Sequence, residues 1–473
     1  MAKKRSYRSR ATAAVTSVLL VTVSPLAWAA AATDGAVDPS FAPPALDSLV
    51  LSMLPVSDGK TLIGGYFTDA GGDLNQDYLI RINPDGSLDT SFTPPAITSP
   101  ASNRSVWALA GVAGGKTVVG GILLDAGGNA DADYIVRIGA DGTLDTSFIP
   151  SGTKPQLNNT PYVILPLGDG TILVGGGFTT AYGDGSKRFI VRMSADGSLY
   201  SPWTPPAGVS NVNGSNVWGL AELTNGKIIV GHDFNGNSFS IMDADGTNAS
   251  STNLGGSVKG FVPLADGSLI VYGDFTNAGG VPAIDRLARL NADGTLDTSW
   301  VPPVVPAEIY SASLTPDGQI MIGGTFASIN GDSSFKYLAR VNGDGTLDET
   351  FIPLALNSLV RSLSTTESGT GLVGGYFTSA GGVTGLDYLA RFLSPPEESS
   401  DPQAPRAPLQ QYGINPDGEC TAPLPDATDF PALLSMKMEA WGKSWAWWPN
   451  SSTGGWVCTR QPYYTGSGSW AVR

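Results

Sequence analysis

Short apolar runs alternate with polar turns along most of the chain. Where this pattern is first clear, the apolar runs span residues 49–54, 60–67, 78–83 and 88–92. An Asp-Gly pair separates the first run from the second and the third from the fourth, and a longer polar stretch, 68–77, separates the middle two. Asp-Gly between apolar runs is typical of a tight hairpin, because glycine adopts positive φ without strain. The pattern therefore predicts four antiparallel strands.

The third and fourth runs belong to a phrase that returns at intervals of about fifty residues. The phrase at 81–92 has close copies at 137–148, 289–300 and 340–351, and a degenerate copy at 192–203. Self-similarity at this period indicates a propeller, a solenoid or a repeat array. Four antiparallel strands per repeat favour the propeller, in which one such sheet is a blade.

The number of repeats follows from the aromatic residue that closes each of them. These residues are Phe41, Phe92, Phe148, Trp203, Trp300 and Phe351. One interval of 97 residues, from Trp203 to Trp300, holds two units, and the first of them, at 219–251, is degenerate and has Ile241 in place of arginine. The last unit lacks its fourth strand, and residues 34–41 have the form of that strand. We therefore expect an all-β fold over residues 30–393: a seven-bladed β-propeller closed by the N-terminal strand, which pairs an otherwise open sheet edge.

The repeat resembles a known family. Gly64 to Phe67, followed by Arg81 to Phe92, matches the pattern of the delta-60 repeat family of secreted bacterial proteins, and the resemblance covers about residues 34–393. It implies a propeller shape. It implies no activity, because the family has no common one.

Charged residues recur within the repeat, and we interpret them as structural. An arginine on the third strand and an aspartate on the fourth are expected to pair, since a buried charge is tolerated only with a partner. The predicted pairs are Arg81 with Asp89, Arg137 with Asp145, Arg289 with Asp297, and Arg340 with Asp348. We assign the Asp-Gly carboxylates to turn capping rather than to calcium, because each turn has few oxygen ligands at close spacing.

The N-terminus reads as a secretory leader, residues 1–29, with a basic start, a short apolar run and the small residues Ala27 and Ala29 before the expected cleavage site. Its removal takes away five basic residues and leaves 22 against 42 acidic ones, a net charge of −20. A protein this acidic repels nucleic acid. We expect no transmembrane segment and a secreted or cell-surface location.

The end of the chain differs from the repeats in composition. Residues 394–412 are rich in Pro, Ser and Glu and read as a linker. Residues 413–473 form a small module in which we predict a disulfide between Cys420 and Cys458. The module is rich in Trp and Tyr, and exposed aromatic residues stack on sugars or anchor protein interfaces. The alternative is that these residues form the module's own core or its contact with the propeller. The candidate ligand-binding residues are Trp445, Trp447, Trp448, Trp456, Tyr463 and Tyr464.

Catalytic chemistry has little support in the sequence. The chain has one histidine, His232, in the degenerate repeat. We predict no catalytic residues, no metal site and no cofactor. The leading hypothesis is an exported, non-catalytic binding scaffold for a glycan, a cell-wall polymer or a secreted protein partner. The alternatives are a carbohydrate-active hydrolase or lyase with a pocket in the propeller, and a subunit of a secreted surface assembly.

Topology indicates which face of a propeller would bind. Both Asp-Gly turns of a repeat fall on one face, so the longer loops fall on the other. This long-loop face is the candidate recognition surface of the propeller. It would hold the loops 68–76, 124–132 and 179–187 and the linkers 94–105, 150–162 and 205–216.

Overall fold

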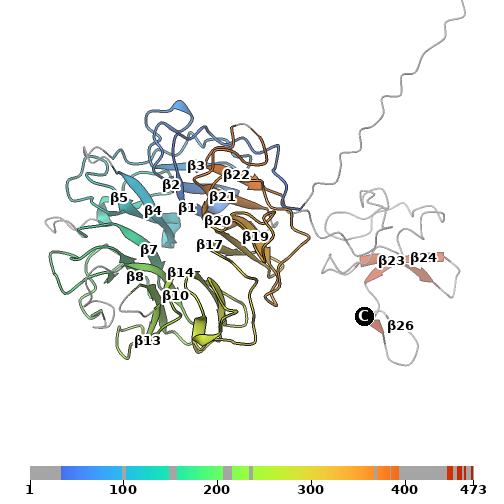
Figure 1. The fold of residues 1–473 in the computed structure, drawn as a ribbon. Coiled ribbons are helices and arrows are strands. Elements are labelled where there is room, and N and C mark those ends of the chain that lie inside the picture. The colour runs from blue at the N-terminus through green and yellow to red at the C-terminus, as the bar shows by residue number, and fades with distance from the viewer. Residues whose placement is uncertain are drawn as a thin grey trace, which may run out of the picture.

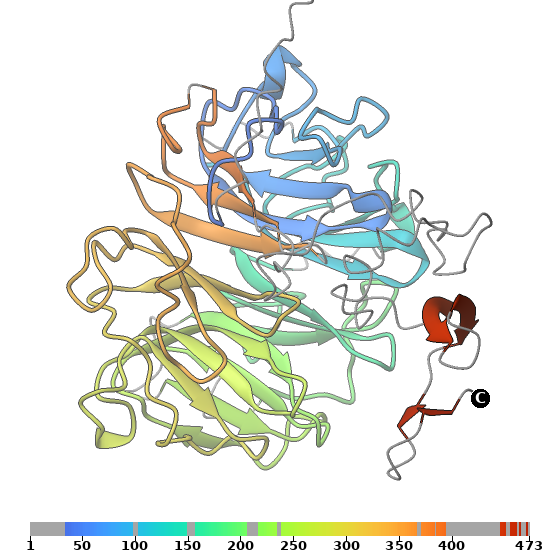
Figure 2. The ribbon, with the colours of Figure 1, turned by 90° about the vertical axis from the view of Figure 1, so that its right-hand side faces the viewer.

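The computed structural model describes residues 34–97, 103–148, 157–205, 216–233, 238–366, 370–383 and 385–393, and the backbone of four short strands nearer the C-terminus. Across residues 34–393, as far as they are described, the fold is all-β and propeller-like, with seven small antiparallel sheets and no α-helix. Figure 1 shows the seven sheets around a common centre. The first and last sheets, blue and orange, lie side by side there and in the side view of Figure 2.

Each sheet has an inner, a middle and an outer strand in chain order. The strands of the first three sheets are β1 (Val50–Pro55), β2 (Thr61–Gly65) and β3 (Leu79–Ile82); β4 (Ser105–Val112), β5 (Lys116–Ile122) and β6 (Ile135–Ile138); and β7 (Pro161–Pro166), β8 (Ile172–Gly176) and β9 (Ile190–Met193). The fourth sheet contains β10 (Val217–Glu222), β11 (Ile228–His232), β12 (Phe239–Met242) and β13 (Ser250–Thr252).

The remaining three sheets follow the same order. They contain β14 (Ser257–Pro263), β15 (Leu269–Asp274) and β16 (Leu287–Leu290); β17 (Ile309–Leu314), β18 (Ile320–Gly324) and β19 (Leu338–Val341); and β20 (Val360–Thr365), β21 (Gly371–Gly375) and β22 (Leu389–Phe392). Short 3-10 turns are η1 (Ser57–Gly59), η2 (Ala70–Gly72), η3 (Ala113–Gly115), η4 (Thr146–Phe148) and η5 (Ala278–Gly280).

The predicted fourth strand is shorter than the sequence pattern suggests. In the first sheet it is a single bridge between Ile82 and Leu88, and equivalent bridges occur at Leu144, Leu199, Leu296 and Leu347. The chain then leaves the sheet, and the aromatic residue that closes each of these repeats is buried. The degenerate repeat is the one whose fourth strand, β13, is regular within the described residues.

The N-terminal segment lies against the last sheet. Val37 bridges Phe392, and the backbone N–H of Gly35 donates to Leu393 O at 2.8 Å. Arg391 Nε also donates to Asp38 Oδ2 at 2.7 Å. This position matches the bridge that Leu88 forms in the first sheet, so residues 34–41 occupy the edge of the last sheet.

The core lies between neighbouring sheets, where five of the seven middle strands carry a Gly-Gly pair. A Cβ on Gly64 would lie 2.4 Å from Val106 Cγ1 of the second sheet. At Gly374 the same atom would lie 2.4 Å from Val50 Cγ1 of the first sheet. Both distances are shorter than van der Waals contact, so only glycine lets the next inner strand approach this closely.

The Asp-Gly turns are stabilised by their own side chains. Asp85 Oδ1 accepts hydrogen bonds from the N–H of Ser87 at 2.9 Å and from its hydroxyl at 2.7 Å. Gly86 has φ of 91°. The same arrangement recurs at Asp141, Asp293 and Asp344. These carboxylates cap turns, as local turn chemistry requires.

The C-terminal region is described only as backbone strands. They are β23 (Trp445–Asn450), β24 (Gly455–Arg460), β25 (Tyr463–Tyr464) and β26 (Trp470–Ala471), paired β23 with β24 and β25 with β26. Residues 443–448 are compatible with a strand or a helix end by sequence, and 445–450 are a strand. The leader 1–29, the linker 394–412, Cys420 and the side chain of Cys458 lie outside the described residues. The predicted disulfide therefore stays a prediction.

None of the helices in the described part of the chain has the length and apolar character needed to cross a membrane.

Candidate functional site

All seven inner strands share a β-bulge near their first residue. In β4 the pairing with β5 shifts between Val106 and Ala108, which leaves Trp107 as an extra residue. A bulge of this kind redirects the side chain of the extra residue. We call the seven extra residues the bulge ring: Leu51, Trp107, Tyr162, Trp218, Lys259, Tyr310 and Arg361.

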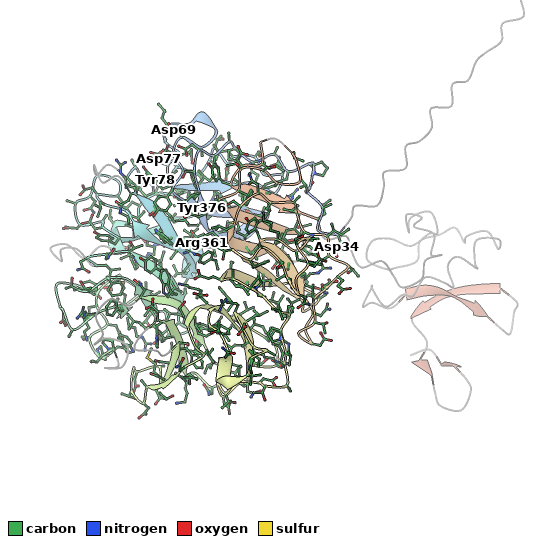
Figure 3. The ribbon with its side chains drawn as sticks, in the orientation of Figure 1. Asp34, Asp69, Asp77, Tyr78, Arg361 and Tyr376 are labelled. Atoms are coloured by element: carbon green, nitrogen blue, oxygen red, sulfur yellow. The ribbon has the colours of Figure 1, made fainter. Side chains whose placement is uncertain are left out.

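The bulge ring lines a cavity of about 330 Å³ where the inner strands converge. This volume is at the lower end of the range of small-molecule sites, about 300–1,000 Å³. The next residue of each strand also lines the cavity, and these residues are small or β-branched, as Ser52, Gly219 and Ser362 show. In Figure 3, Arg361 lies toward the middle of the ring of sheets, whereas Asp69 and Tyr78 lie in a peripheral loop.

Strand register places the bulge ring on the long-loop face. Val50, next to the bulge of β1, pairs with Gly65 at the end of β2, and Gly64 pairs with Leu79 at the start of β3. The loop between β2 and β3 therefore leaves the sheet at the same end as the bulge, and the Asp-Gly turns lie at the other. Parts of the linkers on this face, 98–102, 149–156 and 206–215, lie outside the described residues.

Side chains of the bulge ring contact one another around the cavity. The Arg361 guanidinium carbon is 4.2 Å from the ring centroid of Tyr310 and 5.3 Å from that of Trp107. Trp107 meets Tyr162 edge to face, with centroids 5.2 Å apart. Tyr162 stacks on Trp218 at 4.5 Å with an interplanar angle of 18°. Aromatic contacts of this geometry stabilise about 0.5–1.5 kcal/mol each beyond their burial.

Lys259 and Glu308 complete the circle of contacts. Lys259 Nζ lies 3.9 Å from the centroid of Trp218 and 3.3 Å from Glu308 Oε1. Burial, together with a hydrogen bond to the Glu308 carboxylate, raises the pKa of Tyr310 to about 12, so its hydroxyl stays protonated and donates. Glu308 thus joins Lys259 to Tyr310 from just outside the cavity lining.

The cavity is cationic in an acidic protein. Among the described residues its lining includes Lys259 and Arg361 but no aspartate or glutamate, whereas the whole chain has a net charge of −15. Lys259 is paired with Glu308, and no carboxylate of the described residues lies within ion-pair distance of Arg361. The cavity can therefore offer one guanidinium to an anion, together with aromatic faces.

Two titratable groups of the described residues, Asp133 and His232, lie away from the cavity. Asp133, whose pKa burial raises, belongs to the loop between β5 and β6 and does not line the cavity. His232 is fully buried in β11, with Nε2 2.8 Å from Ser240 Oγ, and it does not line the cavity either. Its neighbour Asp233 accepts a hydrogen bond from Trp218 Nε1 at 3.3 Å and orients that indole. The described residues contain no group of three or more His, Cys, Asp or Glu that could hold a metal ion.

The arginines predicted to pair within each repeat lie at the opposite end of the sheets. Three of the predicted pairs form. Arg81 Nε lies 2.6 Å from Asp89 Oδ2, Arg137 Nε lies 2.8 Å from Asp145 Oδ2, and Arg340 Nε lies 2.7 Å from Asp348 Oδ2. Each guanidinium also stacks on the closing aromatic ring of its repeat at 4.8–4.9 Å. Burial alone would raise the pKa of Asp89, but hydrogen bonds from Lys60, Ser91 and Arg81 hold it well below its usual range.

The predicted pair of Arg289 with Asp297 does not form an ion pair in the structure. Arg289 binds Asp266 of the first Asp-Gly turn, and its Nε donates to Ser268 Oγ at 3.0 Å. Asp297 instead accepts hydrogen bonds from Ser299. The difference follows from the residue after the first Asp-Gly turn. In the first sheet this residue is Lys60, which is long enough to reach Asp89. In the fifth sheet it is Ser268, which is too short to reach Asp297, and Arg289 pairs with the turn carboxylate of Asp266.

Arg192 shows the same alternative. Tyr200 replaces its expected aspartate, and Arg192 pairs with Asp169 of the first turn at 2.5 Å, with Thr171 in the position of Ser268. Arginines of this group also join sheets, since Arg81 donates to Ala140 O of the second sheet and Arg391 to Pro84 O of the first.

The aromatic residues predicted as a second site are in the C-terminal strands. Trp445, Trp447 and Trp448 belong to β23, Trp456 to β24, and Tyr463 and Tyr464 to β25. Trp447 is in register with Cys458, and Pro449 with Trp456. Their side chains are outside the described part of the structure, so their role stays a prediction.

Sequence reasoning missed the bulge ring, although its position is visible in the repeats. Each ring residue follows a buried residue at the start of the inner strand, as in Val106-Trp107, Val217-Trp218 and Val360-Arg361. A column of the aligned repeats that changes from leucine to aromatic to cationic residues would have marked it. The change of residue type is the signal, because structural columns of the repeat keep theirs.

Comparison with known proteins supports the repeat architecture. Residues 57–92, 115–148, 167–199, 264–299 and 315–351 match a family model described as "Domain of unknown function (DUF5122) beta-propeller". The chain contains β-propeller repeats. The five matched propeller repeats correspond to the first, second, third, fifth and sixth sheets. No curated protein sequence matches the chain at a significant level.

Solved structures with similar folds are distant in sequence. The WD40 β-propeller domain of Doa1 is 14% identical, with a TM-score of 0.48, over 76% of this chain and 97% of that chain. Virginiamycin B lyase from Staphylococcus aureus is 15% identical, with a TM-score of 0.48, over 74% and 97%. The extracellular domain of a putative hybrid two-component system from B. thetaiotaomicron is 12% identical, with a TM-score of 0.46, over 75% and 42%.

Proposed function

We propose that this protein is an exported, non-catalytic binding protein whose binding site is the cavity lined by the bulge ring. The observation that carries the proposal is that all seven inner strands bulge at the same position and direct a side chain to one cavity. Core packing alone does not require these seven side chains to point into the cavity. Half-buried aromatic side chains that line a cavity with cations beside them, as Trp107, Tyr162 and Trp218 do, are typical of recognition sites.

The proposal includes a closed, seven-bladed propeller as the scaffold. The bridge from Val37 to Phe392 and the packing of Val50 against Gly374 support closure by the N-terminal strand. A closed ring has no free sheet edge, and it holds the seven inner strands in fixed relation. A rigid frame of this kind keeps binding residues oriented before the ligand arrives, which lowers the entropic cost of binding.

Export and a second binding element complete the proposal. The basic and apolar start of the chain supports export through a cleaved leader. The C-terminal module, with the predicted Cys420–Cys458 disulfide and its aromatic strands, would attach the propeller to a glycan, a wall polymer or a protein partner. A ring cavity for a small ligand and a tail for a surface are compatible in one secreted protein.

Binding of the mature chain to a panel of oligosaccharides and to purified cell wall tests this function. We would compare it with a chain truncated after Leu393 and with Trp107→Ala and Trp218→Ala variants. Trp300→Phe is the matched control, because Trp300 is buried away from the cavity and its indole donates to Gly343 O.

We expect oligosaccharide binding to survive truncation and to be lost in both cavity variants, with Trp300→Phe unchanged. Binding that disappears with the tail and ignores Trp107 and Trp218 would move recognition to the C-terminal module and overturn the proposal for the cavity.

A further inference from the structure

We propose that the bulge ring binds a sugar that carries a carboxylate, and that Arg361 receives the carboxylate. This inference rests on the proposed function, since it names the ligand class of the same cavity. Three observations carry it: the unpaired guanidinium, the aromatic and hydroxyl lining, and the local balance of charge.

Arg361 is held in position without an acidic partner among the residues that the structure describes. It lies between Tyr310 and Trp107, with its guanidinium carbon 4.2 and 5.3 Å from their centroids. Stacking on aromatic faces leaves the N–H donors of the planar guanidinium directed outward in its plane. Two of these donors fit the two oxygens of a carboxylate. The six arginines on outer strands, by contrast, all contact an aspartate.

The remaining lining fits a sugar. Trp107, Tyr162 and Trp218 form a continuous aromatic arc beside the guanidinium, and aromatic rings pack against the C–H faces of sugars. Ser311 and Ser362, each one residue beyond a bulge, also line the cavity. Their hydroxyl groups are of the kind that hydrogen-bond to sugars.

The charge balance favours one negative charge on the ligand. Glu308 neutralises Lys259 at 3.3 Å, which leaves Arg361 as the one unneutralised cation among the described residues that line the cavity. A neutral sugar would leave this guanidinium without an anion. A phosphate monoester has a charge of about −1.5 to −2 near neutral pH, which exceeds what the cavity neutralises in a chain of net charge −15. A carboxylate matches.

Isothermal titration of the mature, full-length protein tests this assignment. The probes are matched pairs that differ in the carboxylate: oligogalacturonate against oligogalactose, and oligoglucuronate against oligoglucose. Glucose 6-phosphate and an aspartate-rich hexapeptide are the other anions. The variants are Arg361→Gln, Arg361→Lys, Trp107→Ala, and Arg289→Gln as a control in an arginine distant from the cavity.

We expect one of the acidic oligosaccharides to bind about 10- to 100-fold more tightly than its neutral match, as a charged hydrogen-bonded pair provides. Arg361→Gln should remove this preference and keep weak binding of both sugars, and Arg361→Lys should retain a small part of it. Trp107→Ala should abolish the binding of both sugars, and Arg289→Gln should change the binding of neither. Circular dichroism of each variant establishes that it is folded.

The outcomes separate this inference from the proposed function. Equal binding of acidic and neutral sugars that Trp107→Ala abolishes would keep the cavity as the site and refute the carboxylate. Tighter binding of glucose 6-phosphate or of the peptide would refute the ligand class. If neither sugar binds, or if Trp107→Ala changes nothing, the proposed function fails together with the inference.

Discussion

Two ends of the same sheets use arginine in different ways. At the end of the Asp-Gly turns, each outer-strand arginine contacts an aspartate and most stack on a closing aromatic ring. At the end of the long loops, Arg361 contacts two aromatic rings and no carboxylate of the described residues. A buried charge with a partner is a structural feature, because the pair replaces the water that each ion has lost. A partly buried charge without one is available to a ligand.

The comparison also shows where the repeats are free to vary. The outer-strand arginine is present in six repeats. The bulge position, by contrast, holds leucine, tryptophan, tyrosine, lysine or arginine, depending on the repeat. Variation at a position that always faces the same cavity gives each sheet its own contribution to one site. The turn end maintains the scaffold, and the bulge end differentiates it.

The largest effect is expected from removing the N-terminal segment that supplies partners to Arg340 and Arg391. Deletion of residues 30–41 removes Asp34, Asp38 and the buried Phe41, the partners of Arg340 and Arg391. Loss of a buried aromatic residue costs about 3–5 kcal/mol, and loss of one partner of a buried ion pair costs a similar amount. Urea unfolding should show a loss of more than about 5 kcal/mol, against a control that lacks only residues 30–33. An unchanged unfolding midpoint would refute closure by this strand.

Burial should rank the turn-end arginines among themselves. Arg340 and Asp348 have side chains only 7% exposed, whereas Arg289 and Asp266 are 25% and 54% exposed. We expect Arg340→Ala to cost about 3–5 kcal/mol and Arg289→Ala about 1 kcal/mol or less. Equal losses in urea unfolding of the two variants would show that burial does not set the strength of these pairs.

Acid should weaken the turn end. The pKa values of Asp89 and Asp145 lie well below their usual range in the folded chain, because hydrogen bonds to lysine, serine and arginine outweigh burial. Groups with a lowered pKa stabilise the fold above the unfolded value of about 3.9, and this contribution is lost as the pH falls below it. Unfolding midpoints measured from pH 7 to pH 2 should therefore fall steeply below about pH 4. The Asp89→Asn variant should have a lower unfolding midpoint at pH 7, and its midpoint should fall less steeply as the pH decreases. A midpoint that falls as steeply as in the wild type would show that Asp89 does not cause the acid sensitivity.

The smallest predicted effect concerns the affinity of the cavity for an acidic sugar. Glu308→Gln removes the carboxylate that pairs with Lys259, so the cavity gains one unit of positive charge. A charge change near the surface is worth about 1 kcal/mol at this range, so affinity for an acidic sugar should rise about fivefold. Stability should change by less than about 1 kcal/mol. Titration that finds weaker acidic-sugar binding would indicate that Glu308 contacts the ligand.

Local chemistry made the turns and the repeat predictable from the sequence. Asp85-Gly86 specifies its own turn through a positive φ and bonds to Ser87, and the closing Phe92 is buried as its repeated position indicates. The partner of Arg289 was not predictable from its own repeat phrase, because Ser268, in another turn of the same sheet, decides it.

The site depended on pairing between strands. The bulge that presents Trp107 arises where β4 loses register with β5, and no residue type marks a bulge of this kind. The circle from Arg361 to Tyr310 joins sheets distant in sequence from Trp218 and Lys259. Such a constellation becomes apparent only when the sheets are arranged around one centre.

The most direct test of the contrast is Arg361→Ala, studied by thermal unfolding and by titration with an acidic oligosaccharide on the same preparation. The account predicts a loss of stability below about 1 kcal/mol, the size of an exposed cation–π contact, and a loss of at least tenfold in acidic-sugar affinity. Destabilisation as large as that of Arg340→Ala, with sugar binding unchanged, would make Arg361 another structural arginine and contradict the account.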